Sequence, residues 1–387
     1  MNLGEKIKKI REKKNLTQKE LAKKLGLKDA TIVSKIENST RKIQADELAS
    51  LYGVLGCTPD ELFGDEDFPR IEINHAFTRY INRSDDNDKA LKDEILGRLA
   101  RQAKNLIKFE DFLRIDNRHY LPTINDSLPT SDKDRNSQTE ILANSVRKAW
   151  ELGRDPVNNL EYILETKSII WMRWNNLGEY SGICAPYKTR PFIILNANEA
   201  RARQKFSLAH ELCHALMDIG QGAIFTRKSE GVGGFSEYSH IEKRANFFAG
   251  KFLMALDAAL EFAHINRFEL SNPSAANVMQ LASFFGMSGD AILITLIHYG
   301  KISWELRDAL KQKIHPLSET SGQTFLKDWD WSDSVATEFS TIPRLVRLGF
   351  QACLRRTINE GALSELLGIP RQRMAEKIRE YSSLVGD

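Results

Sequence analysis

Two histidines and a glutamate with the spacing His210-Glu211-x-x-His214 lie inside an otherwise apolar stretch, residues 206–218. On a helix, residues four apart share one face about a turn apart, so the two imidazoles can bind one Zn²⁺ ion. Glu211 then lies beside the ion without binding it, placed to take a proton from a water molecule there. The spacing predicts a hydrolytic zinc site. The alternative is an amphipathic core helix whose two histidines are merely hydrogen-bonded.

A catalytic zinc ion takes three protein ligands and keeps its fourth position open, so a third ligand is expected downstream. The continuation typical of metzincins needs Gly at 217 and His at 220, where the chain has Met217 and Gly220, and that class is excluded. A helix with apolar residues at helical spacing is predicted over residues 241–254. The candidate third ligands in this region are Glu230, Glu237, His240 and Glu242.

The two helical segments together resemble the ImmA/IrrE family of metallopeptidases, over about residues 137–263. FSLAHELCHALMD is similar to the family's zinc-binding helix, and EKRANFFAGKFLM is similar to its second helix, Glu-x-x-Ala-Asn-x-Phe-Ala. The resemblance implies zinc ligands at His210, His214 and Glu242. It also implies that Glu211 is the general base.

Two residues depart from the family's pattern. Cys213 stands where Gly is usual, and Ala255 stands where Pro commonly follows the second helix. Cys213 occupies a free position of the motif, and the proline concerns only how the helix ends, so the implied chemistry is unaffected. The hydrogen-bond donor to the tetrahedral oxyanion is left open, with Tyr238 and His240 as candidates.

A short apolar strand is predicted at residues 192–195, just before the histidine helix. We expect this strand at an edge of the sheet, where it would hold an extended substrate by main-chain pairing. The alternative is an interior strand, because FIIL is apolar on both faces. Hydrophobic spacing also predicts a strand over 169–174, helices over 90–115 and 139–152, and a linker over 117–137.

The N-terminal segment differs from the rest in charge. Residues 1–43 carry 13 Lys and Arg against 5 Asp and Glu, although the whole chain has a net charge of only +3. This local excess favours contact with a polyanion. A helix over 3–13, a capping box of Thr17 and Glu20, and a third helix over 28–37 are typical of a helix-turn-helix. The alternative is a solvated lysine-rich surface or a small protein-binding adaptor.

The segment LTQKELAKKLGLKDATIVSKIEN is similar to lambda-repressor-like (XRE) DNA-binding domains, and DELASLYGVLGCTPDELF resembles their closing helices. In such domains the third helix enters the major groove, and the N-terminus of the second contacts a phosphate. The resemblance implies base contacts from Asp29, Ala30, Thr31 and Lys35, phosphate contacts from Thr17 and Gln18, and further backbone charge from Lys28, Arg41 and Lys42.

Composition limits the class of protein. A chain of 387 residues with 42% hydrophobic residues can bury about two or three cores. It has no apolar stretch of membrane-spanning length and no apolar leader, so we expect a cytoplasmic protein without membrane contact. Its four cysteines are far apart and lack CxxC spacing, which is typical of free thiols in a reducing compartment.

We therefore predict a multidomain, mostly α protein. A helix-turn-helix domain spans 1–66, a helical connector and linker 67–136, and a helical C-terminal region 271–387. Between them, residues 137–270 form an α+β zincin-like metallopeptidase domain, in which the His-Glu-x-x-His helix packs on a small sheet.

The predicted function, implied by the two resemblances, is that of a DNA-binding regulatory zinc metalloendopeptidase. It would cleave a partner repressor or other regulatory protein at one site, in stress, DNA damage, or phage and mobile-element activity. The expected partners are double-stranded operator DNA, single-stranded DNA as a candidate activator, and that protein substrate, and a homodimer is favoured. The alternative is a transcriptional regulator whose peptidase-like domain is a silent sensor or scaffold.

Overall fold

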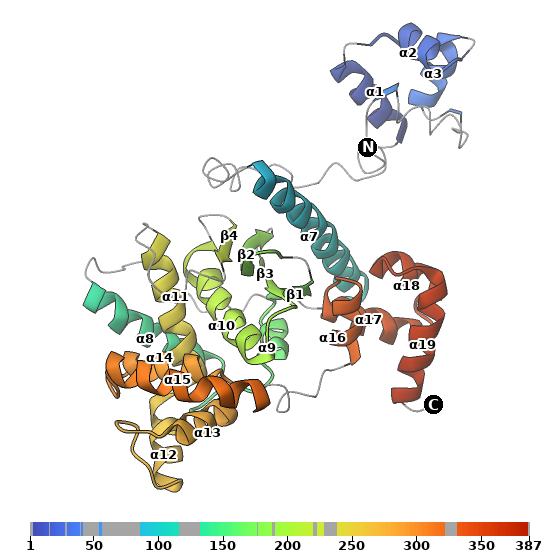
Figure 1. The fold of residues 1–387 in the computed structure, drawn as a ribbon. Coiled ribbons are helices and arrows are strands. Elements are labelled where there is room, and N and C mark those ends of the chain that lie inside the picture. The colour runs from blue at the N-terminus through green and yellow to red at the C-terminus, as the bar shows by residue number, and fades with distance from the viewer. Residues whose placement is uncertain are drawn as a thin grey trace. The chain divides into compact units, whose positions relative to one another are not determined.

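The structure, a computed structural model, divides into two compact units, Met1–Asn74 and His75–Asp387 (Figure 1). The predicted multidomain, mostly helical architecture with one small sheet is confirmed. The finer domain boundaries at residues 66, 136 and 270 stay predictions. The described residues are 3–14, 16–27, 29–38, 40–41, 54–55, 86–115, 132–175, 177–187, 190–219, 223–227, 238–321 and 331–385.

The first unit contains the predicted helix-turn-helix. The capping box of Thr17 and Glu20 starts its second helix, and Gly26 takes a left-handed φ of 70° in the turn that follows. Buried Ile7, Leu21 and Val33 bring one residue from each helix into a small core. Of the segment expected to form the closing helices, only residues 54–55 belong to the described part of the chain. The helices are α1 (Leu3–Lys13), α2 (Gln18–Lys24) and α3 (Ala30–Glu37).

The second unit has a four-stranded sheet with the strand order β1-β3-β2-β4. Strand β3 runs parallel to β1 and antiparallel to β2, and β2 is also antiparallel to β4. Every residue of β1 and β3 is buried, as is usual for strands covered on both faces. The strands are β1 (Ile170–Trp174), β2 (Tyr180–Tyr187), β3 (Arg190–Asn196) and β4 (Ile224–Arg227).

The strand expected at the sheet edge is in the interior. Strand β3 pairs with β1 on one side and with β2 on the other, so its predicted role as a substrate-binding edge is wrong. Its apolar side chains on both faces fit an interior position, which was the alternative. Strand β4 ends the sheet instead, and β2 is its one partner among the described strands.

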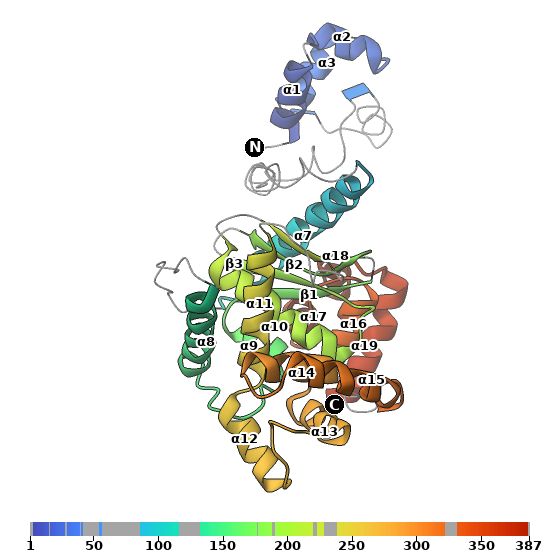
Figure 2. The ribbon, with the colours of Figure 1, turned by 60° about the vertical axis from the view of Figure 1, so that its left-hand side comes forward.

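Helices cover the sheet and carry the histidine motif. Helix α10 packs against β2 and β3, and α11 lies alongside α10 (Figures 1 and 2). Helix α8 packs against α11, and it begins seven residues before the predicted helix at 139. The helices up to this point are α7 (Asp86–Phe112), α8 (Asp132–Ala149), α9 (Leu160–Thr166), α10 (Arg201–Met217) and α11 (Tyr238–Leu253).

The remaining helices belong to the same unit. Gly286, at a φ of 63°, ends α13, and the Ser288 side chain caps α14. No single helix in the described part of the chain is long and apolar enough to span a membrane; only the α13–α14 pair, bent by 96°, meets that criterion jointly, on length and composition alone. These helices are α12 (Leu256–Ile265), α13 (Ala275–Phe285), α14 (Gly289–His298), α15 (Trp304–Ser321), α16 (Trp331–Glu338), α17 (Pro343–Leu354), α18 (Glu360–Leu367) and α19 (Arg371–Val385).

Buried ion pairs attach the C-terminal helices to the sheet. The fully buried carboxylate of Glu110 on α7 accepts hydrogen bonds from Arg190 on β3 and from Arg344 on α17, each 2.5 Å long. Arg173 on β1 donates to Asp333 on α16 at 3.1 Å. Because these contacts join segments far apart in sequence, α7, α16 and α17 form one packed body with the sheet.

Candidate metal centre and nucleic-acid interface

The histidine motif lies in the buried part of α10. His210 is 3% exposed, and Glu211 and His214 are fully buried. The four-residue spacing places both imidazoles on one helix face, with ring centroids 4.8 Å apart. Helix α11 packs against this face and brings Glu242, which is 6% exposed, to the same point.

Three ligand atoms converge at that point. The Nε2 atoms of His210 and His214 are 3.0 Å apart. The carboxylate of Glu242 lies 3.0 Å from the first and 3.5 Å from the second. Zinc bonds of about 2.0–2.1 Å in a tetrahedron place neighbouring ligand atoms about 3.4 Å apart. The donor set therefore fits a divalent cation, and it is the one such group of His, Cys, Asp and Glu among the described residues.

The other ring nitrogens have partners that direct these atoms. His210 Nδ1 lies 2.9 Å from the amide oxygen of Asn246, and His214 Nδ1 lies 2.9 Å from a carboxylate oxygen of Asp218. Oxygen acceptors fix the protons on Nδ1, which leaves the Nε2 lone pairs free to bind a metal. Asp218 was missed in the sequence, although its spacing of four residues from His214 is a readable helical signal.

The three converging residues, His210, His214 and Glu242, are called the triad below, and their charges influence one another. Burial alone would lower the pKa of His210, but the hydrogen bond and charge of Glu242 outweigh burial and raise that pKa. Burial would raise the pKa of Glu242, and its contacts with His210 and His214 outweigh burial and lower that pKa. Acceptors held this close are stabilised by a positive charge between them, which is what a metal ion provides.

Glu211 occupies a confined position beside the triad. Both of its carboxylate oxygens are buried and make no hydrogen bond of normal geometry, although the Thr226 hydroxyl is near enough to interact with them. Burial raises the pKa of Glu211, against the opposing effects of the two imidazoles and the Thr226 hydroxyl. A carboxylate that is more basic than usual is suited to general-base catalysis near neutral pH.

Gly182 on β2 makes room for this carboxylate. A Cβ atom at position 182 would lie 2.5 Å from Glu211 Oε1 and 2.9 Å from Glu211 Cδ. No sequence signal indicated this residue, because the contact joins a strand to a helix that packs on it. A side chain at position 182 would therefore force the Glu211 carboxylate to shift.

We expect Gly182→Ala to displace Glu211 and lower the cleavage rate by about 10²-fold, the usual consequence of a shift near 1 Å in a catalytic group. Zinc content should not change, because the three atoms nearest to the added methyl group all belong to Glu211, which is not a ligand. The measurement is the rate of substrate cleavage with metal analysis of the same sample. Gly97→Ala on α7 is the matched control, since its Cβ would meet no atom within 4 Å. Equal cleavage rates for the two variants would contradict the assignment.

Strand β4 contributes one further side chain. Thr226, paired across the sheet with Gly182, has its hydroxyl oxygen 3.4 Å from His210 Nε2. The candidate oxyanion donors Tyr238 and His240 lie at the start of α11, but their side chains are outside the described residues, as are Glu230 and Glu237. The Thr226 hydroxyl therefore places a polar group of the edge strand β4 next to the triad.

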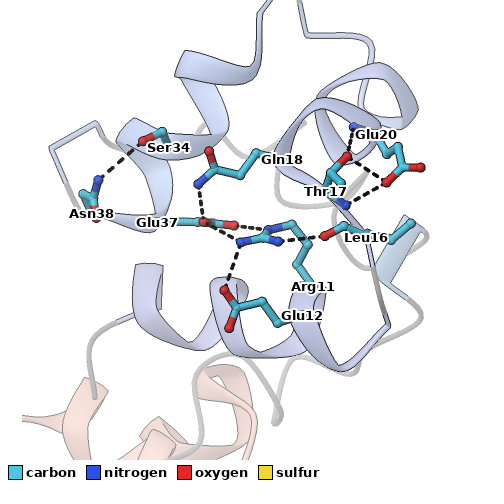
Figure 3. Close-up of polar contacts among 9 residues, drawn as sticks. All are labelled: Arg11, Glu12, Leu16, Thr17, Gln18, Glu20, Ser34, Glu37 and Asn38. Atoms are coloured by element: carbon cyan, nitrogen blue, oxygen red, sulfur yellow. Dashed lines mark hydrogen bonds and ion pairs between the residues drawn. The ribbon is translucent and has the colours of Figure 1, made fainter.

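In the first unit, a buried ion pair fixes the helix-turn-helix (Figure 3). Arg11 on α1 donates to both carboxylate oxygens of Glu37 at the end of α3, at 2.6 and 3.1 Å. The same guanidinium donates to the backbone oxygen of Leu16 at 2.7 Å, and Gln18 on α2 donates to Glu37 at 2.8 Å. One carboxylate thus joins all three helices. The XRE resemblance implies a phosphate contact for Gln18, and no signal in the sequence indicates the ion pair.

Glu37→Ala should destabilise the first unit by about 3–5 kcal/mol, because it leaves the buried Arg11 guanidinium without its main partner. Thermal unfolding of the full chain should then show a lower transition for this unit and an unchanged one for the second. Glu12→Ala is the control, because Glu12 is exposed and contacts the same arginine at 3.4 Å, and its loss should cost about 1 kcal/mol or less. Similar unfolding of both variants would refute the role of the pair.

The residues predicted to contact DNA include exposed residues on α3, helix caps, and residues that are half-buried or outside the described part of the chain. Thr31 and Lys35 are exposed and four residues apart on α3, which places them on one helix face. The carboxylate of Asp29 accepts from the Thr31 backbone at 3.0 Å, so Asp29 caps α3. Thr17 is the cap of α2. Of the others, Ala30 and Arg41 are half-buried, and Lys28 and Lys42 lie outside the described residues.

Comparison with known proteins gives matches for both units. Residues 172–296 match the family described as IrrE N-terminal-like domain, a metallopeptidase family, and residues 7–62 match the helix-turn-helix family. The chain is also similar to the HTH-type transcriptional regulator ImmR of Bacillus subtilis (strain 168). The two are 31% identical over 125 residues, which cover 30% of this chain and 98% of that protein.

Proposed function

Because the chain belongs to the ImmA/IrrE family of metallopeptidases and carries an N-terminal XRE-type helix-turn-helix domain, we propose that it is a DNA-binding regulatory zinc metallopeptidase. Its substrate is a partner repressor or related regulatory protein, cleaved at one site. The observation that carries this proposal is the convergence of His210, His214 and Glu242 beside the confined carboxylate of Glu211. A structural histidine pair would need neither the carboxylate of Glu242 nor a second buried carboxylate beside it.

The residues would divide the chemistry among them. His210, His214 and Glu242 hold the zinc ion, which when bound supplies Lewis-acid activation of a water molecule and of the scissile carbonyl. Glu211 removes a proton from the attacking water and later gives it to the leaving amine. Burial of Glu211 favours the first of these roles, because a raised pKa makes the carboxylate accept the proton more readily.

The substrate would bind along β4. This strand ends the sheet, and its Thr226 hydroxyl lies beside the triad. An extended peptide that pairs with the outer edge of β4 would pass the metal centre with its main chain fixed by hydrogen bonds. The substrate-binding role expected of β3 is thus assigned to β4, the edge strand that β2 separates from β3.

The helix-turn-helix would bring the peptidase to operator DNA. Thr31 and Lys35 on α3 are the base-facing candidates, and the N-terminus of α2 at Thr17 contacts a phosphate. The similarity to ImmR, which is named as a transcriptional regulator, favours a second candidate function. In that alternative the chain regulates transcription, and its peptidase fold is a silent sensor or scaffold.

A cleavage assay distinguishes the two functions. Purified full-length protein is incubated with candidate helix-turn-helix repressors, with and without single- or double-stranded DNA, and the products are identified by mass spectrometry. Peptidase function predicts two fragments from one cut, formed only without a zinc chelator. Cleavage that persists in the chelator would overturn the proposed mechanism, and intact repressors under every condition would favour the silent regulator. Removal of residues 1–74 should abolish salt-sensitive DNA binding, and retained binding would refute the DNA-binding role.

A further inference from the structure

The carboxylate of Asp218 joins the two helices that carry the triad. Asp218 is the C-terminal cap residue of α10 and is 1% exposed. One of its oxygens lies 2.9 Å from His214 Nδ1, and the other accepts from the guanidinium of Arg244 on α11. Arg244 lies two residues after Glu242, so one buried carboxylate connects a histidine of the triad to the helix of the third ligand.

The two histidines are supported differently. The partner of His210 Nδ1 is the neutral amide of Asn246, whereas the partner of His214 Nδ1 is a carboxylate. A carboxylate makes the imidazole a stronger donor through Nε2 and restrains the ring more firmly than an amide does. Arg244 in turn compensates the buried charge of Asp218, which would otherwise be costly.

We propose that Asp218 and Arg244 are positioning residues that set the metal affinity of the centre. Asp218 holds His214 with its Nε2 atom toward Glu242, and Arg244 holds Asp218 while keeping α11 in register with α10. The inference rests on the proposed function, because it requires the triad to bind a divalent ion. It assigns a role in metal affinity to two residues that touch neither the ion nor the substrate.

The test is the zinc affinity of the metal-free full chain, measured by competition with a chromophoric chelator. Asp218→Asn should lower the affinity by about 10- to 100-fold. Because Arg244 acts through Asp218, the double variant Asp218→Asn/Arg244→Met should lose no more affinity than Asp218→Asn alone. The double variant removes both buried charges, so the measurement remains possible if a single variant folds poorly.

A purely structural role would give a different pattern. Asp218→Asn and the double variant would then unfold at lower temperature without metal, while their folded form bound zinc as tightly as wild type, and the inference would be overturned. Asp290→Asn is the control, because the ion pairs of Asp290 are with Arg307 at 2.9 Å and Lys311 at 3.3 Å. Its zinc affinity should equal that of wild type. Failure of the wild-type protein to bind zinc would refute the proposed function itself, whereas equal affinity of wild type and Asp218→Asn would refute only this inference.

Discussion

Glu211→Gln is expected to retain the bound zinc and to lower kcat for repressor cleavage by about 10²- to 10⁴-fold, the contribution usual for a general base. Glutamine has nearly the same shape, so it should fit against Gly182, but it cannot accept the proton of the attacking water. The measurement combines single-turnover cleavage with metal analysis of the same preparation. Cleavage at the wild-type rate by the zinc-loaded variant would exclude Glu211 as the base.

The same substitution has a second expected result that separates catalysis from folding. The Glu211 carboxylate is fully buried and makes no hydrogen bond of normal geometry, which is an unfavourable place for a charge. Replacing it with a neutral amide should leave the melting temperature of the metal-free protein unchanged or raise it. A residue retained at a cost to stability but needed for rate is typical of active sites. A large fall in melting temperature would instead indicate a structural role.

Glu242→Gln should weaken zinc binding by about 10²- to 10³-fold. A four-ligand zinc site contributes about 10–16 kcal/mol, so one ligand accounts for about 2.5–4 kcal/mol. Each tenfold change in affinity corresponds to about 1.4 kcal/mol. Competition with a chelator of known affinity measures the loss. Glu230→Gln and Glu237→Gln, which replace the other carboxylates considered as third ligands, are the matched controls and should bind zinc like wild type. Loss of zinc in either control with retention in Glu242→Gln would assign the third ligand differently.

Most of what could be predicted of the metal centre came from the spacing of residues along single helices. The four-residue interval between His210 and His214 is a property of one helix, and the structure brings both side chains to one point with Glu242. The apolar spacing of α11 was likewise readable, because a helix face repeats within a few residues. Residue types alone left four candidates for the third ligand, and the family resemblance singled out Glu242.

What could not be predicted depends on contacts between distant segments. The order β1-β3-β2-β4 places β3 inside the sheet, and nothing in its apolar sequence shows which strands pair with it. Gly182 gave no signal, because its importance comes from a helix side chain that packs against β2. The pairing of Arg11 with Glu37 spans 26 residues and was equally hidden in a lysine-rich segment.

Metal analysis of the purified full-length protein tests the central claim most directly. The claim is that His210, His214 and Glu242 form one zinc site. About one equivalent of zinc per chain should remain bound after gel filtration, and the variant His210→Ala/His214→Ala should contain almost none. A wild-type protein without a stoichiometric divalent ion, or a double variant that keeps its zinc, would contradict the account.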